Sequence, residues 1–299
     1  MGEKRLWLAL LAPLLMSCQV IHGLDGYNTD DPSGPAGAGG TDGGPSSTST
    51  STGSSGGDVP CGQRPGPAMI FIPPGTMGGT VGYCIDSTEV TMGHYNGWVE
   101  GTPAPKVEEQ PPYCAWNADY MPNLSGNQCA VAPFDPVGKA LYPVTCVDWC
   151  DAAAYCAWAG KHLCGGIGGD DYTPADVANA TVSEWFRACS RAGEKTYPYG
   201  DDFDAVSCAE PGSEGGTVSV TAKPKCKGGY PGLFGMSGNA WEWENLCEAW
   251  DGDLDRCFHR GGSFWEASGE LRCDTASDLH RRNSYNTNIG FRCCADRVP

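Results

Sequence analysis

The stretch PVTCVDWCDAAAYCAWAGK, residues 143–161, carries the clearest helical pattern in this chain. Apolar side chains recur in it at intervals i, i+3, i+4 and i+7, which is the spacing of one face of an α-helix. Gly160 is a natural C-terminal stop, so we predict a helix from about residue 148 to residue 159. The face expected to enter the core consists of Trp149, Ala152, Ala153 and Cys156.

Two shorter elements are predicted before this helix. Residues 68–72 form an apolar strand bounded by proline and glycine. Thr91 is the expected N-cap of a helix whose apolar face carries Tyr95, Trp98 and Val99. Together with the helix predicted from residue 148, these elements place regular structure on both sides of a long irregular region.

That region and one further helix complete the predicted elements. Residues 100–142 are rich in proline, and we expect them to form a surface insertion pinned by Cys114 and Cys129. A third helix is expected to begin at Thr181, with Glu184 at the capping-box position.

Composition narrows the class of protein. The chain of 299 residues has a formal net charge of -17 and no run of basic residues, so a nucleic acid is not expected as a partner. Its 43 glycines and 23 prolines favour a loop-rich fold over a helical bundle.

Residues 1–17 are typical of a targeting segment. Lys4 and Arg5 precede an apolar stretch of 11 residues, which is too short to span a bilayer. Cys18 follows Leu-Met-Ser in a pattern that resembles a bacterial lipobox, so we predict that it is lipidated. The alternative is ordinary secretory cleavage nearby, with Cys18 a chance residue.

Residues 18–60 follow as a tether. Within them, residues 33–57 are almost wholly Gly, Ser, Thr, Pro and Ala, a composition that cannot bury enough surface to fold. Gln19 after the lipidated cysteine indicates the outer membrane or cell surface by the bacterial sorting rule. The membrane is therefore expected as a partner through the lipid anchor only.

Seventeen cysteines are the most unusual feature of the composition. Without Cys18 an even number remains, which in an exported chain indicates up to eight disulfides. A zinc or iron–sulfur protein is the competing interpretation, but the sequence has no CxxC pair and only five scattered histidines.

Several sequence blocks, in the same order, resemble the sulfatase-modifying-factor family, which includes formylglycine-generating enzyme. The resemblance implies that residues 61–299 form one domain with a loop-rich, disulfide-rich α+β fold, low in regular secondary structure and related to C-type lectins. The opening blocks are Met69–Gly75 and Thr88–Thr91, and the later ones are Pro143–Lys161, Glu184–Trp185, Tyr197–Gly200, Gly232–Trp243, Arg260–Phe264 and Asn288–Cys293.

The resemblance also implies two disulfides. The family's helix cysteine pairs with the cysteine of its terminal Gly-Phe-Arg-Cys, which gives Cys156 with Cys293, and the next helix gives Cys189 with Cys273. Twelve cysteines remain, and for eight of them we have only neighbour pairings as hypotheses: Cys61–Cys84, Cys114–Cys129, Cys208–Cys226 and Cys247–Cys257.

Formylglycine-generating members hold copper with two cysteines, since thiolates favour Cu(I). The matching positions here are Glu266 and Leu271, so copper is not expected to bind and we assign no catalytic residue. Cys273 matches the structural cysteine rather than a redox one. Ser263 matches an active-site serine of the family, although a turn residue after two glycines is the simpler interpretation.

The resemblance implies a structural calcium ion at the turn that precedes the Trp-Glu-Trp motif. The implied ligands are the carbonyls of Gly238 and Ala240 and the side chain of Glu242, a set of oxygens that suits this ion. Gly235 replaces the family's Asn or Asp, which removes one side-chain ligand.

Other chemistries find little support. The sequence contains no GxSxG, HExxH or GxxxxGK[ST] motif, and Glu242 and Glu244 are interpreted as structural. The sugar-binding motifs of C-type lectins are also missing. Four histidines lie far apart in the sequence and are expected at the surface or at helix caps: His94, His162, His259 and His280.

The sequence thus favours a binding or structural module over an enzyme, with an unidentified extracytoplasmic protein, peptide or glycan as partner. Its tryptophans and tyrosines offer material for a peptide or glycan groove. Two alternatives remain open: an enzyme of altered chemistry in the same cleft, and a formylglycine-generating oxidoreductase that acts on sulfatase cysteines through other thiols.

Overall fold

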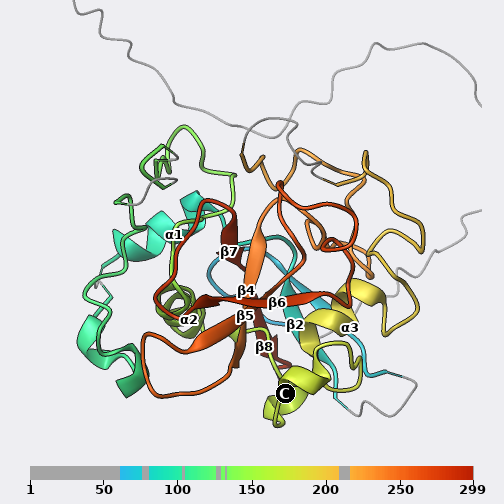
Figure 1. The fold of residues 1–299 in the computed structure, drawn as a ribbon, viewed down its shortest axis with the longest axis horizontal. Helices are drawn as coiled ribbons and strands as arrows, with labels where there is room; N and C mark the ends of the chain where they lie inside the picture. The colour runs from blue at the N-terminus through green and yellow to red at the C-terminus, as the bar shows by residue number, and fades with distance from the viewer. Residues whose placement is uncertain are drawn as a thin grey trace, which may run out of the picture. The chain divides into compact units, whose positions relative to one another are not determined.

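The computed structural model describes residues 61–75, 81–102, 105–125, 129–131, 133–208 and 216–298. The predicted signal peptide, Cys18 and the tether lie outside these residues. Within them the chain forms two small sheets, three α-helices and many connecting loops (Figure 1).

The first sheet joins the beginning and the end of the domain. Its strand order is β1-β2-β8-β3, and all neighbours are antiparallel. The predicted strand at residues 68–72 is β1. The four strands are β1 (Met69–Ile72), β2 (Tyr83–Asp86), β8 (Cys293–Asp296) and β3 (His162–Leu163).

The second sheet has the order β6-β5-β4-β7, with β4 and β7 parallel and the other pairs antiparallel. Its strands are β6 (Ala276–Arg281), β5 (Arg256–Arg260), β4 (Trp241–Cys247) and β7 (Ile289–Phe291). Because β7 ends at Phe291 and β8 begins at Cys293, a single residue, Arg292, separates a strand of the second sheet from a strand of the first.

Helix α2 (Trp149–Trp158) confirms the helix predicted from the opening stretch. Asp148 caps it by accepting a hydrogen bond from the Asp151 amide, and Asp151 completes a capping box. Helix α1 (Met92–Val99) begins after the predicted cap Thr91. Both helices pack against the second sheet, in a core that contains Tyr95, Trp98, Tyr155 and Phe291.

Helix α3 (Glu184–Ser190) begins later than predicted. Its cap is Ser183, whose hydroxyl accepts a hydrogen bond from the Phe186 amide. Thr181 fails as the cap because its own amide and hydroxyl both donate to the Asn179 side chain. Glu184 is therefore the first helical residue, and α3 packs with the first sheet in a second core cluster.

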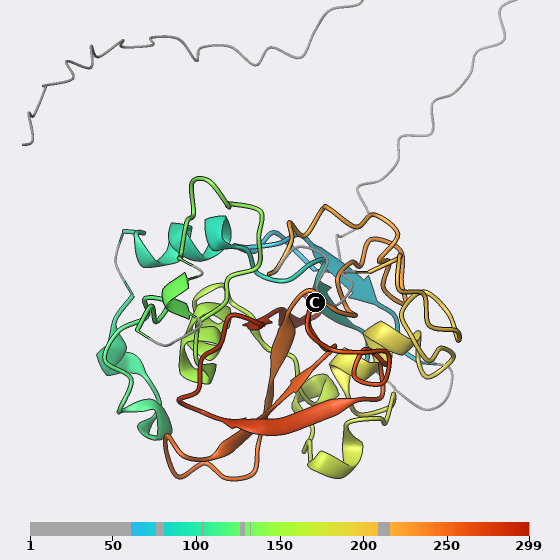
Figure 2. The same ribbon diagram turned by 45° about the horizontal axis from the view of Figure 1, so that its top comes forward.

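The insertion between α1 and α2 is irregular, as predicted, apart from short 3-10 helices. They are η1 (Val107–Glu109), η2 (Pro112–Cys114) and η3 (Cys129–Val131). Two more, η4 (Ile167–Gly169) and η5 (Pro174–Asp176), lie between β3 and α3. Figures 1 and 2 show the insertion beside α1 and α2.

All sixteen cysteines of residues 61–298 lie in eight disulfides. Both pairs implied by the family resemblance are present, and three of the neighbour pairings are correct. They are Cys156–Cys293 and Cys189–Cys273, then Cys61–Cys84, Cys208–Cys226 and Cys247–Cys257.

The fourth neighbour pairing is wrong. Cys114 pairs with Cys150 at the start of α2, and Cys129 pairs with Cys146. The insertion packs on α2, so each of its cysteines meets a partner beyond it rather than its neighbour in sequence.

The expected fold class, a loop-rich and disulfide-rich α+β fold low in regular structure, is confirmed. No helix in the described ranges is long and apolar enough to cross a membrane.

Candidate functional site

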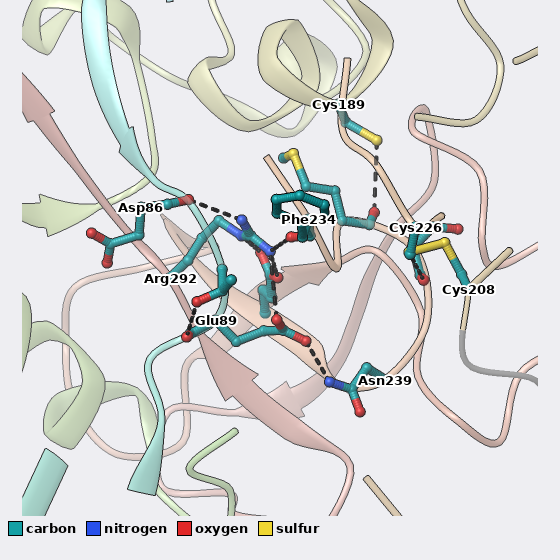
Figure 3. A network of polar contacts seen from close by, with 12 residues as sticks. Asp86, Glu89, Cys189, Cys208, Cys226, Phe234, Asn239 and Arg292 are labelled. Atoms are coloured by element: carbon teal, nitrogen blue, oxygen red, sulfur yellow. Dashed lines mark hydrogen bonds and ion pairs between the residues drawn. A yellow bond between two sulfur atoms is a disulfide. The ribbon is translucent and has the colours of Figure 1, made fainter. Parts of the chain in front are cut away.

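Arg292, the residue between the two sheets, is the centre of a fully buried polar network (Figure 3). Its guanidinium donates to both carboxylate oxygens of Glu242 over 2.7 Å each. The indole N–H of Trp185 donates to the same carboxylate over 2.6 Å. Glu242 therefore receives three hydrogen bonds from donors that are themselves fixed in the core.

The same guanidinium also contacts the end of β2 and the loop that precedes β4. It donates to the carbonyl of Asp86 over 3.0 Å and to the carbonyl of Phe234 over 2.9 Å. The carboxylate of Glu89 lies 3.9 Å away and accepts a hydrogen bond from the Asn239 amide. Figure 3 shows Asp86, Glu89 and Phe234 around Arg292, with Asn239 beside the Glu89 carboxylate.

Glu89 is the member of this network whose hydrogen bonding is incomplete. One of its oxygens, Oε2, is buried without a hydrogen-bond partner among the described residues. Burial raises the pKa of Glu89 to about 7, although the positive charge of Arg292 opposes that rise. One guanidinium thus serves two buried carboxylates, and Glu242 receives the better geometry.

Of the three predicted calcium ligands, Glu242 lies in this network, and its contacts do not fit a calcium site as they stand. Glu242 is already engaged by Arg292 and Trp185, and a guanidinium at this distance would repel a divalent cation. A Cβ atom on Gly235 would lie 2.5 Å from Oε2 of Glu89, so the Glu89 carboxylate fills the space where the family places Asn or Asp.

Glu266 and Leu271, at the family's copper positions, form a different arrangement. Glu266 accepts a hydrogen bond from the Ser263 amide over 2.7 Å and another from the Ser263 hydroxyl. The Asn288 side chain donates to that hydroxyl over 3.2 Å. Leu271 is buried in contact with Gly262, where it offers no lone pair.

Thiolates are also missing around this segment. Cys273, the nearest cysteine in sequence, is bonded to Cys189, and each of the other cysteines in the described residues is likewise in a disulfide. Ser263 is fully buried, and its hydroxyl donates a hydrogen bond to Glu266 and accepts one from the Trp265 amide. These contacts agree with the interpretation of a turn residue. The segment from 263 to 273 is therefore held by hydrogen bonds and one disulfide.

Two histidines that are far apart in the sequence, the buried His259 and the partly exposed His280, lie side by side. Nε2 of His259 lies 2.8 Å from Nδ1 of His280, and His259 is only 1% exposed. Burial, and then the neighbouring His280, lower the pKa of His259 well below its usual value. The two histidines lie on the neighbouring strands β5 and β6, where His280 is opposite Cys257, and no local sequence signal marks this pairing.

The other two histidines have partners near helix starts. His94 contacts the cap hydroxyl of Thr91 over 3.1 Å, as expected for a cap residue. His162 lies 3.1 Å from the buried carboxylate of Glu184, and this contact raises its pKa although burial opposes the rise. The prediction of surface or cap positions therefore fails clearly only for His259.

A cavity of about 470 Å³ separates the insertion from α2. The sequence did not locate an aromatic groove, and the Cys114–Cys150 disulfide joins the insertion to α2 beside this cavity. The aromatic side chains that line the 470 Å³ cavity are Trp98, Tyr113, Tyr120, Trp149 and Trp158.

Comparison with known proteins supports the family resemblance of the sequence. Residues 55–297 match the family described as Sulfatase-modifying factor enzyme 1-like domain. The chain is 29% identical over 191 residues to the formylglycine-generating enzyme of Mus musculus, covering 54% of this chain and 46% of that protein. It is 31% identical over 180 residues to a Bos taurus protein named inactive C-alpha-formylglycine-generating enzyme 2, covering 54% and 53%.

The chain thus spans about half the length of the curated relatives it matches. Among solved structures, it is similar to PvdO from Pseudomonas aeruginosa, with 16% identity, a TM-score of 0.49, and coverage of 77% of this chain and 91% of that one. The match over residues 55–297 assigns the chain to the sulfatase-modifying factor enzyme 1-like domain family.

Proposed function

We propose that this protein is a membrane-tethered, extracytoplasmic binding or structural module that has lost formylglycine-generating activity. The observation that carries the proposal is the pair Glu266 and Leu271 at the positions where catalytic members hold copper. Carboxylate is a poor ligand for Cu(I), and a leucine side chain is no ligand at all.

The hydrogen bonds of Glu266 strengthen this argument. Its carboxylate is committed to the amide and hydroxyl of Ser263, so it stabilises the turn rather than facing a substrate. A disulfide sulfur is not a thiolate, so Cys273 cannot substitute while it is bonded to Cys189. The name of the Bos taurus relative, which describes an inactive protein, is consistent with such a loss in this family.

The tethered location rests on the sequence alone. The lipobox that ends at Cys18 and the Gly/Ser/Thr/Pro-rich residues up to 60 support anchoring at the outer membrane or cell surface. Replacing Cys18 with Ala should release the protein from the membrane fraction. A variant that still sediments with membranes would place the anchor elsewhere.

The activity is tested by incubating the copper-loaded mature protein with a Cys-x-Pro-x-Arg peptide under oxygen. We expect mass spectrometry to detect no formylglycine, whereas a catalytic family member should convert the peptide in parallel. Glu266→Cys with Leu271→Cys should restore little, because a thiol at position 271 would be buried against Gly262. Copper-dependent formylglycine from the wild-type protein would overturn the proposal.

A further inference from the structure

A second cavity, of about 610 Å³, lies between the end of α3 and the loop that leads into β4. The yellow segment after α3 and the orange segment before β4 run beside each other here in both views (Figures 1 and 2), and the Gly229 amide donates to the carbonyl of Ala188 across them. Four cationic side chains line this basic groove: Arg191, Lys195, Lys225 and Lys227.

The charge of the basic groove is opposite to that of the whole chain. The protein has 36 acidic and only 19 basic residues, yet no carboxylate lines the groove among the described residues. A cleft lined by one sign of charge focuses the electrostatic potential and concentrates ions of the opposite sign. An anion is therefore drawn to this face of an otherwise acidic molecule.

The cations are largely uncompensated. Arg191 pairs with Glu194 over 3.3 Å, and within the described residues the three lysines have no carboxylate within 4.0 Å. Lys195 donates to the carbonyl of Pro198. The nearby Asp204 carboxylate accepts instead from the Ser207 hydroxyl over 2.6 Å.

The two central lysines are presented by a fixed piece of backbone. Lys225 and Lys227 are exposed on either side of Cys226, which is buried and bonded to Cys208. An antiparallel bridge between the backbones of Lys227 and Phe234 closes the turn that begins at Lys227. The ammonium groups therefore extend from a preorganised support, which reduces the entropy lost on binding.

The walls of the groove are flat and partly apolar. Tyr199 and Tyr230 are half-buried, with part of each ring accessible, and Pro231 is exposed beside them. Tyr199 stacks on Tyr197 with ring centroids 5.5 Å apart, so its plane is fixed. Rigid ring faces beside lysines suit a ligand that carries both flat rings and negative charges.

We propose that the basic groove binds an acidic polysaccharide, with its sulfate or carboxylate groups on Lys225 and Lys227 and its sugar rings on the tyrosine faces. Exposed aromatic rings offer apolar surface to the C–H faces of sugars, and lysines bind oxyanions as point charges. This inference supplies a ligand class for the binding function proposed above and rests on that function.

The test is calorimetric titration of the mature protein with a sulfated heparin-type oligosaccharide, with oligogalacturonate and with neutral dextran. We expect one or both acidic sugars to bind, with affinity that falls as salt rises, and dextran not to bind. The two acidic probes distinguish sulfate from carboxylate as the recognised group.

Two variants of equal charge change make the test specific. Lys225→Gln with Lys227→Gln should weaken binding by about tenfold or more. The control, Lys106→Gln with Arg281→Gln, removes two exposed cations that do not line the groove and should change affinity by no more than about twofold.

Three results would overturn the inference: no binding of either acidic sugar, equal weakening in both variants, or tighter binding of polyglutamate or an oligonucleotide than of the sugars. None of these results depends on formylglycine chemistry. The peptide assay described above therefore judges the loss of activity separately from the choice of ligand.

Discussion

The junction around Arg292 and the segment from 263 to 273 both hold a carboxylate by hydrogen bonds, but with different consequences. At the junction, the buried carboxylate of Glu242 forms an ion pair with the buried guanidinium of Arg292. Removing either partner alone would leave an unpaired charge in the core. In the segment, Glu266 is only partly buried and bonds to a serine three residues away. The comparison indicates that the fold depends on the first region and tolerates change in the second.

The largest effect is expected from breaking the junction. Arg292→Met should destabilise the protein by about 3–5 kcal/mol, because it leaves two buried carboxylates without their cation. Urea unfolding followed by tryptophan fluorescence measures this. Adding Glu242→Gln to Arg292→Met should recover part of the loss, and a single variant as stable as wild type would show that the junction does not support the fold.

The buried carboxyl of Glu89 should make the stability of the junction depend on pH. Its pKa is raised to about 7 in the folded protein against about 4.5 when unfolded, so the folded state binds the proton more tightly. The contribution of Glu89 to stability is therefore full below about pH 4.5 and is lost as the pH rises through about 7. Glu89→Gln should remove this loss, which we expect to be about 3 kcal/mol.

The measurement is the free energy of unfolding of wild type and Glu89→Gln at several pH values from 4.5 to 8. The difference between the two proteins should change steadily in favour of the variant as pH increases. Glu109→Gln, at an exposed position, is the matched control and should show no such trend. A constant difference for Glu89→Gln would contradict the raised pKa.

A smaller effect is expected in the 263–273 segment. Glu266→Gln keeps an oxygen that can accept from Ser263 and loses only the added strength of a charged acceptor, so we expect a loss of about 1 kcal/mol. Thermal unfolding would detect it. A loss as large as that of Arg292→Met would remove the distinction between the two regions.

The smallest expected effect is that of calcium removal. Since Glu242 is engaged by Arg292, chelation with EGTA should leave the unfolding midpoint unchanged. A clear drop that added calcium reverses would show that the ion does bind this turn, and that Glu242 changes partners to coordinate it.

Local patterns predicted much of this structure. The spacing of Trp149 and Cys156 gives α2 and its inward cysteine, and Thr91 gives the start of α1. The cap of α3 was misplaced because Thr181 and Ser183 both look like caps, and only the side chain of Asn179 decides between them. The family resemblance, rather than any local pattern, supplied the pair Cys189–Cys273.

The remaining features depend on contacts between distant segments. The Glu242–Arg292 pair joins residues 50 apart, and the insertion cysteine Cys114 finds Cys150 only after the insertion has packed on α2. The basic groove combines lysines from two loops that the sequence does not show to be neighbours. Such contacts depend on tertiary packing, which neither helical periodicity nor residue spacing encodes.

The most direct test of the central claim, that the domain keeps the family's scaffold without thiolates for copper, is alkylation of the mature protein without reduction. Peptide mapping should find no labelled cysteine among residues 61–298, since all sixteen lie in disulfides. Two or more labelled cysteines in that range would contradict the account and reopen the search for a copper site.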